Sequence, residues 1–120
     1  MSDAMTIQDR WPTLSTRERD AMVAKARGDT FKPDNRATTY AEYLKPYSTD
    51  WSLVGPLLEE MLAAGLFVEL YQHGEIARLE IEAELHNRQN LGDEGTNAFE
   101  ADSFPSAICL AYCCWKGIEP

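Results

Sequence analysis

Residues 76–85 alternate apolar and charged side chains with a period of two, and this pattern constrains the fold more than any other feature of the chain. The apolar residues are Leu79, Ile81, Ala83 and Leu85. The charged residues between them are Arg78, Glu80, Glu82 and Glu84. Many of these residues also favour helices, but no helical face would collect Leu79, Ile81 and Leu85 together. Because successive side chains of a strand point to opposite faces, we predict a strand. With the bulky stretch 66–72 and a turn at His73-Gly74 before it, the pattern predicts an antiparallel hairpin, 66–72/76–85.

A first helix is predicted after residue 14. Ser15 and Glu18 have the spacing of a capping box, and Gly28 can adopt the left-handed conformation that ends a helix. Residues 1–14 before it are predicted to form a loose arm, and residues 15–120 a single α+β domain. Trp11 lies in the arm and is therefore the tryptophan that we expect to be an exposed contact residue.

A second helix is predicted to begin at Ser48, Thr49 or Asp50, each of which can cap it. Pro56 has no backbone N–H to donate, so it predicts either a kink in this helix or a helix that begins later in the chain. The helix should end at Gly65. Its apolar residues follow the spacing of one buried face: Val54, Leu57, Leu58, Met61 and Leu62.

The C-terminal third predicts a loop followed by a buried helix. Residues 86–102 are polar and are predicted to form a long loop. Pro105 suits the first turn of a helix, and residues 106–116 are apolar nearly all round, which predicts a helix inside the core. Trp51 and Trp115 are expected to fill the core between helices. The predicted fold class is α+β, with the small antiparallel sheet packed with three helices.

Charge is distributed unevenly along the chain. The formal net charge is −9, with residues 1–45 at +1 (eight Lys/Arg, seven Asp/Glu) and residues 46–120 at −10 (three against thirteen). Non-specific DNA binding needs clustered cations, so no direct nucleic-acid binding is expected. Binding to a basic surface of a partner protein is one interpretation of the acidic charge. The alternative is that the charge only prevents aggregation. No apolar run approaches the length of a membrane span, and residues 1–10 do not resemble a signal peptide.

The candidate chemical groups do not form a catalytic pattern. Cys109 and Cys113 are one helical turn apart, but a structural zinc site needs four ligands, and neither His73 nor His86 has a spaced partner. All three cysteines, including Cys114, are expected to be reduced and to pack as buried apolar groups. The sequence also lacks a phosphate-binding loop and nucleophile motifs. We therefore expect no enzyme activity, no cofactor and no metal.

Two regions are candidates for partner binding. Glu80, Glu82 and Glu84 form an acidic strip that could imitate DNA phosphates, although a solvated sheet face is the commoner case. The second region consists of the start of the second helix together with loop 86–102. Free backbone N–H groups at the start of a helix favour anions, and loops often carry binding residues. Its candidate contact residues are Tyr47, Ser48, Thr49 and Trp51. The alternative is that these residues only cap the helix.

Three short motifs occur in a fixed order: Arg19–Gly28, which contains Asp20 and Val23-Ala24; Ser48-Thr49-Asp50; and Ala107-Ile108-Cys109. In this order they resemble the phage ABA-sandwich domain family of small bacteriophage and prophage proteins. The resemblance implies a phage or prophage origin and an α/β/α-type sandwich. It supplies no catalytic residue.

The expected function is that of a small, non-enzymatic, phage-encoded binding protein. It would act in the cytoplasm of the bacterial host and inhibit or sequester a defence component, either a protein or a small nucleotide signal. The alternatives are a structural or assembly accessory of the phage particle, an acidic DNA-mimic inhibitor, and a small hydrolase or nuclease with clustered His and acids. A homo-oligomer remains open.

Overall fold

The computed structural model describes residues 7–28, 45–82 and 96–118, which form helices and one three-stranded antiparallel sheet of order β1-β2-β3. The elements are α1 (Ile7–Arg10), η1 (Trp11–Thr13), α2 (Thr16–Arg27), η2 (Tyr47–Thr49), α4 (Trp51–Ala63), β1 (Phe67–His73), β2 (Ile76–Glu82), β3 (Thr96–Ala101) and α5 (Phe104–Lys116). The predicted α+β class, with helices packed on an antiparallel sheet, is confirmed.

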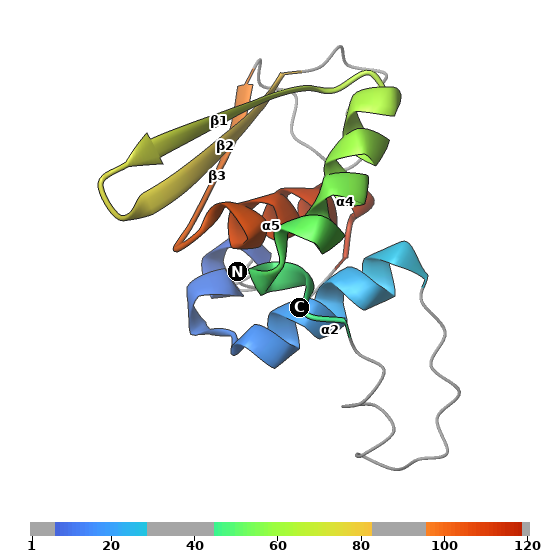
Figure 1. Ribbon diagram of the computed structural model, residues 1–120, viewed down its shortest axis with the longest axis vertical. Helices are drawn as coiled ribbons and strands as arrows, with labels where there is room; N and C mark the ends of the chain where they lie inside the picture. Colours follow the sequence, from blue (N-terminus) through green and yellow to red (C-terminus); the bar gives the residue numbers. More distant parts are fainter. Residues whose placement is uncertain (1–6, 29–44, 83–95, 119–120) are drawn as a thin grey trace, which may run out of the picture.

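Helix α5 lies at the centre of the molecule (Figure 1). It packs under β2 and β3 on one side and against α2, α4 and η2 on the others. Within the described residues the layers therefore follow the order sheet, α5, α2, and the helices lie on one side of the sheet. This order differs from the α/β/α arrangement that the resemblance implied.

The position of α5 follows from its sequence. Ser103 caps it by accepting a hydrogen bond from Ser106 N, Pro105 lies in its first turn, and Gly117 ends it in the left-handed conformation. Every residue from Pro105 to Cys113 is buried, and so is Trp115. A helix that is apolar all round must be covered on all sides, so the prediction of a buried last helix is confirmed.

The predicted capping signals of α2 are confirmed. Ser15 Oγ accepts a hydrogen bond from Glu18 N at 3.2 Å, and Ser15 N donates to Glu18 Oε1 at 2.9 Å. Gly28 ends the helix with φ 74°. The buried residues Val23 and Ala24 belong to the main core, so these local signals set the bounds of a helix that packing on α5 then stabilises.

Helix α4 begins where Asp50 caps it, with Asp50 Oδ1 accepting a hydrogen bond from Ser52 N at 2.9 Å. It runs from Trp51 to Ala63 with Pro56 inside, so the proline does not delay its start. The buried face holds Val54, Leu57 and Met61 as predicted. Leu62, expected on that face, is instead 51% exposed.

The predicted hairpin is confirmed as the pair β1–β2. Its register runs from Phe67 opposite Glu82 to His73 opposite Ile76, so the turn residues are Gly74 and Glu75 rather than His73 and Gly74. Gly74 has φ +60°, a conformation that suits glycine. On β2 the inward residues are buried as the alternation predicted: Ala77, Leu79 and Ile81. Residues 83–85 lie outside the described residues.

Strand β3 was not predicted. Thr96–Ala101 falls in the expected loop 86–102, but it pairs with β2 and places Phe99 opposite Leu79, where it is buried. The segment is short and carries polar residues, so its strand conformation depends on the ladder and on burial of Phe99 rather than on local preference. Residues 86–95 of the predicted loop lie outside the described residues.

The expectation of a loose N-terminal arm is wrong for residues 7–13, which form α1 and η1. Trp11, expected to be exposed, is fully buried. Its indole Nε1 donates to Ser106 Oγ of α5 at 2.9 Å, and Ile7 is also in the core. A partner 95 positions away in the chain provides this burial, and no local pattern around Trp11 signals it.

Candidate functional site

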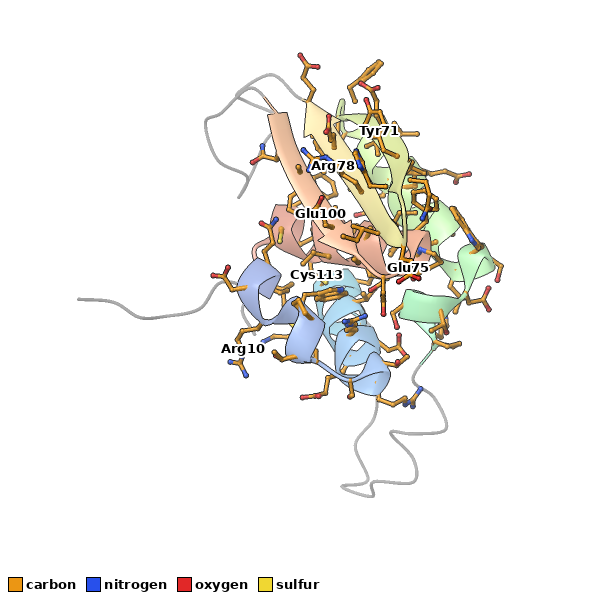
Figure 2. The ribbon with its side chains drawn as sticks, turned by 90° about the vertical axis from the view of Figure 1, so that its left-hand side faces the viewer. Arg10, Tyr71, Glu75, Arg78, Glu100 and Cys113 are labelled. Carbon is orange, nitrogen blue, oxygen red and sulfur yellow. The ribbon has the colours of Figure 1, made fainter. Side chains whose placement is uncertain are left out.

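The face of the sheet that points away from α5, here called the outer sheet face, is not covered by any described helix. The register assigns its members from the alternation in β1, β2 and β3. They are Phe67, Glu69, Tyr71, His73, Ile76, Arg78, Glu80, Glu82, Ala98 and Glu100. Figure 2 labels Tyr71, Arg78 and Glu100, which come from the three neighbouring strands.

Three large apolar side chains are exposed on this face. Phe67 is 64%, Ile76 46% and Tyr71 39% exposed. Tyr71 lies opposite Arg78, so Ile76, two residues earlier on β2, is its diagonal neighbour. Exposed apolar groups that gather on one face typically indicate a contact surface.

The same face is acidic. Glu69 lies directly opposite Glu80, and like charges in that position are destabilising. Arg78 compensates in part, because its Nε contacts Glu80 Oε2 at 2.7 Å and its Nη1 contacts Glu100 Oε2 at 3.2 Å. With Glu82, the face holds four carboxylates and one guanidinium. Glu80 and Glu82 of the predicted acidic strip therefore lie here, whereas Glu84 is outside the described residues.

Hydrogen bonds to the carboxylates perturb two groups on the outer sheet face. Tyr71 donates its hydroxyl hydrogen to Glu69 Oε2 at 2.6 Å, and this bond raises the pKa of Tyr71. Hydrogen bonds to Glu80 and Glu100 raise the pKa of Arg78. Sequence reasoning missed Phe67, Glu69 and Tyr71, because β1 has apolar residues on both of its faces and lacks a clear alternation.

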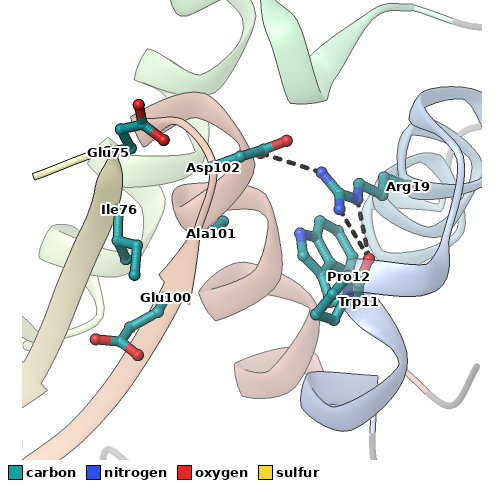
Figure 3. Close-up of a pocket in the computed structure, with 8 residues that line it drawn as sticks. All are labelled: Trp11, Pro12, Arg19, Glu75, Ile76, Glu100, Ala101 and Asp102. Atoms are coloured by element: carbon teal, nitrogen blue, oxygen red, sulfur yellow. Dashed lines mark hydrogen bonds and ion pairs between the residues drawn. The ribbon is translucent and has the colours of Figure 1, made fainter.

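A pocket of about 450 Å³ lies between η1, α2 and the adjacent ends of β2 and β3 (Figure 3). Its lining residues are Trp11, Pro12, Arg19, Glu75, Ile76, Glu100, Ala101 and Asp102. The Arg19 guanidinium is already engaged: it donates to Trp11 O at 2.9 and 3.1 Å, to Ser106 Oγ at 2.9 Å and to Asp102 Oδ1 at 3.3 Å. The other charged groups at the pocket are carboxylates, so it is poorly suited to a phosphate.

The predicted binding segment 47–51 is mainly a structural connection. Tyr47 and Ser48 are buried, and Thr49 Oγ1 donates to Pro46 O at 3.4 Å. Trp51, expected in the core, is 54% exposed, and its ring lies 6.0 Å from that of Phe104. Of the four residues proposed there, Trp51 and Thr49 are accessible to a partner.

Residues from the three sequence motifs meet around α5. Asp20 is fully buried, and its Oδ1 accepts hydrogen bonds from Ser48 N at 2.8 Å and Ser48 Oγ at 2.7 Å. Arg19, next to Asp20, donates to Ser106, which precedes Ala107 of the third motif. The second oxygen of Asp20 has no hydrogen-bond partner in the described residues, and Arg17 Nη1 is 3.8 Å from it. These contacts join α2, η2 and α5, so the motif residues hold the helices together.

The cysteines are free thiols in α5. Burial raises the pKa of Cys109, and the negative charge of Asp20 adds to this effect. Burial also raises the pKa of Cys113 well above its ordinary value and that of Cys114 to about 12. The thiols are therefore protonated near neutral pH and pack as small apolar groups.

No group of three or more His, Cys, Asp or Glu side chains is placed to hold a metal ion within residues 7–28, 45–82 and 96–118. His73 is exposed on the outer sheet face, and His86 lies outside the described residues. None of the described helices is both long and apolar enough to cross a lipid bilayer.

Comparison with known protein families, with curated proteins and with solved structures gives no match for this chain. The resemblance to the phage ABA-sandwich domain family therefore stays a prediction.

Proposed function

We propose that this chain is a small non-enzymatic binding protein and that the outer sheet face contacts a basic region of a partner protein. The observation that carries the proposal is the combination on one uncovered face of exposed Phe67, Tyr71 and Ile76 with carboxylates that outnumber the cations. Aromatic side chains supply most of the binding energy in many interfaces. Complementary charge supplies orientation and fast association.

The opposed pair Glu69 and Glu80 favours a cationic partner in particular. In the free protein these two carboxylates face each other across β1 and β2, and Tyr71 and Arg78 each bind one of them. A Lys or Arg from a partner placed between them would relieve the remaining repulsion. Arg is also suited to stacking on Tyr71.

The motif resemblance directs the choice of partner. We infer a bacterial host defence component that a phage-encoded protein inhibits or sequesters in the host cytoplasm. Between a protein and a nucleotide signal, the charges favour a protein. The outer sheet face is acidic, and the charged residues that line the described pocket are Glu75, Glu100 and Asp102 together with Arg19, whose guanidinium is already engaged.

A DNA-mimic inhibitor is the second candidate, because Glu69, Glu80, Glu82 and Glu100 spread negative charge over three adjacent strands. In that case the target would be a nucleic-acid-binding protein. The carboxylates alone would carry recognition, and Phe67 would contribute little.

The test is affinity capture of host proteins from bacterial lysate by the wild-type chain and by two single variants with the same charge change. Glu82→Lys alters the outer sheet face, whereas Glu59→Lys alters an exposed position of α4. We expect a partner that Glu82→Lys loses, that Glu59→Lys retains, and whose capture weakens as salt rises. Equal capture by both variants would contradict the proposal.

Two further measurements separate the alternatives. Competition of the captured partner by duplex DNA, with Phe67→Ala as effective as wild type, would identify a DNA mimic. Native mass spectrometry with cyclic nucleotides tests the nucleotide ligand, and a stoichiometric nucleotide complex would contradict a protein target. Recovery of the chain in purified virions at fixed stoichiometry would instead indicate a structural role.

A further inference from the structure

Strand β1 forms an edge of the described sheet and lacks the features that usually protect an edge. It pairs with β2 over seven consecutive residues without a bulge, contains neither proline nor glycine, and carries one charged residue, Glu69. All its residues except Val68 are exposed. A long, regular edge of this kind is a template for another strand.

The hairpin turn determines which backbone groups of β1 are free. His73 and Ile76 flank a two-residue turn, and residues in that position exchange both of their hydrogen bonds. Hydrogen bonding to β2 then falls on every second residue of β1. The intervening residues, Val68, Leu70 and Gln72, direct their N–H and C=O groups away from β2 and towards the free edge.

We propose that β1 pairs in antiparallel orientation with β1 of a second copy of this chain, with Leu70 of each copy opposite Leu70 of the other. In this register Val68 lies opposite Gln72 of the other copy, so all three outward-directed residues find partners. The pairing forms about six inter-strand hydrogen bonds. The result is a six-stranded sheet with two-fold symmetry and the helices of both copies on one side.

Charge and shape agree with this register. Glu69 faces Tyr71 of the other copy, and Tyr71 already binds a carboxylate of this kind within its own chain. Phe67 faces His73. At the centre the two Leu70 side chains, each 37% exposed in the single chain, cover one another on the inner face. Of the three strands, α5 contacts mainly β2 and β3, whereas β1 is contacted by α4. The exposure of Leu70 shows that this part of the inner face of β1 is accessible.

Neighbouring registers are less favourable. A register centred on Glu69 opposes the two carboxylates directly, which is destabilising, and leaves Gln72 without a partner in the strand. A register centred on Tyr71 pairs Leu70 with Gln72 and places Val68 opposite Gly74 of the turn. The register centred on Leu70 is therefore the one that satisfies the free backbone groups and separates the charges.

The first experiment measures mass by sedimentation equilibrium over a range of concentrations. We expect a reversible doubling from the 13.5 kDa of one chain. Leu70→Lys should give a monomer, because two ammonium groups would meet at the axis, whereas Glu82→Lys on β2 should remain dimeric. Circular dichroism checks that both variants are folded. A wild-type monomer up to hundreds of micromolar, or a dimer that a folded Leu70→Lys variant retains, would overturn the proposal.

The second experiment tests the register by disulfide trapping. Glu69→Cys and Tyr71→Cys variants are oxidised separately and as a mixture. Residues directly opposite in a non-hydrogen-bonded pair have the Cβ separation that a disulfide can bridge, so the mixture should cross-link rapidly and each variant alone slowly. Rapid cross-linking of Glu69→Cys with itself would overturn the register. The partner-capture experiment is independent, since a monomer that still captures its partner removes only this inference.

Discussion

The two edges of the sheet differ in what lies next to them. At the β3 edge, Gln8 of α1 donates its side-chain N–H to Ala98 O at 2.8 Å, and α5 follows β3 directly in the chain. At the β1 edge, no described residue satisfies the outward backbone groups, and Phe67, Leu70 and Tyr71 are exposed. Within the described residues the sheet thus has a closed side, where Gln8 bonds to β3, and an open side, where the outward backbone groups of β1 have no partner.

This difference shows how the chain distributes its contacts. The N-terminal segment makes the long-range contacts on the closed side. Gln8 donates to Ala98 of β3, 90 positions away, and Trp11 donates to Ser106 of α5, 95 positions away. The hairpin has no such long-range neighbour at its free edge in the described residues. Exposure on β1 is therefore a property of the tertiary arrangement and not of a polar strand sequence, because β1 contains Phe, Val, Leu and Tyr.

The largest loss of folding stability is expected when a contact on the closed side is removed. Trp11→Ala removes a fully buried indole and its bond to Ser106, and large-to-small changes of this kind cost about 3–5 kcal/mol. Phe67→Ala on the open side should cost less than about 1 kcal/mol, because most of its ring is exposed. Urea unfolding of both variants measures the difference. Similar losses at the two positions would show that the two sides are equally well packed.

A second, smaller effect concerns the far side of α5, where Asp20 fixes η2 to α2. Asp20→Ala leaves the buried N–H of Ser48 without its acceptor and the hydroxyl with only a long contact to Thr16 O at 3.5 Å, and the expected cost is about 1–3 kcal/mol. Ser48→Ala should cost less, because Asp20 keeps its bond from the backbone N–H. Chemical denaturation ranks the two variants. A larger loss in Ser48→Ala would contradict the view that unsatisfied donors dominate the cost.

The third effect depends on pH and concerns α4, the helix that contacts β1. Burial acts to raise the pKa of Glu60, but hydrogen bonds from Lys116 and Tyr112 outweigh it, so the pKa is lowered. A lowered carboxyl pKa stabilises the fold above the unfolded-state pKa, and this contribution is lost as pH falls through the folded-state pKa. Glu60→Gln should therefore cost about 0.2–1 kcal/mol at neutral pH, given its partial exposure, and little in acid.

Glu59→Gln is the matched control for that measurement, since Glu59 is the exposed neighbour in the same helix. Thermal unfolding from neutral to acidic pH compares the two variants. A constant difference between them at every pH would argue against the hydrogen bonds of Glu60 as its source.

The smallest expected effect tests the closure of the β3 edge itself. Gln8→Ala removes the side-chain donor to Ala98, and because this bond is exposed its contribution is at most about 0.5 kcal/mol, the lower limit of the usual range. Hydrogen exchange should become faster in β3 and stay unchanged in β1. Unchanged exchange in β3 would mean that Gln8 does not protect this edge.

The predictable part of the fold depends on local signals. The capping box at Ser15, the glycine at the end of α2 and the alternation on β2 act within a few residues, so they can be read from the sequence. Burial of Trp11, exposure of Trp51 and the strand conformation of β3 depend on neighbours far away in the chain. The sequence therefore indicated the class and the hairpin but misplaced two tryptophans.

The candidate site was predictable only in its acidic part. Glu80 and Glu82 belong to the clear alternation of β2, whereas the aromatic part, Phe67 and Tyr71, belongs to a strand with apolar residues on both faces. The exposure of these aromatic residues follows from their place on the outer sheet face, which no described helix covers, and no pattern in the sequence reveals it.

The central position of α5 has a consequence for how the chain acquires its structure during synthesis. Helices α2 and α4 and strands β2 and β3 all precede α5 in the chain, and all of them pack on it. A nascent chain that lacks α5 lacks the helix on which all four of these elements pack. Folding as one cooperative unit must therefore wait until residues 104–116 have left the ribosome, and earlier segments stay exposed to chaperones and proteases until then.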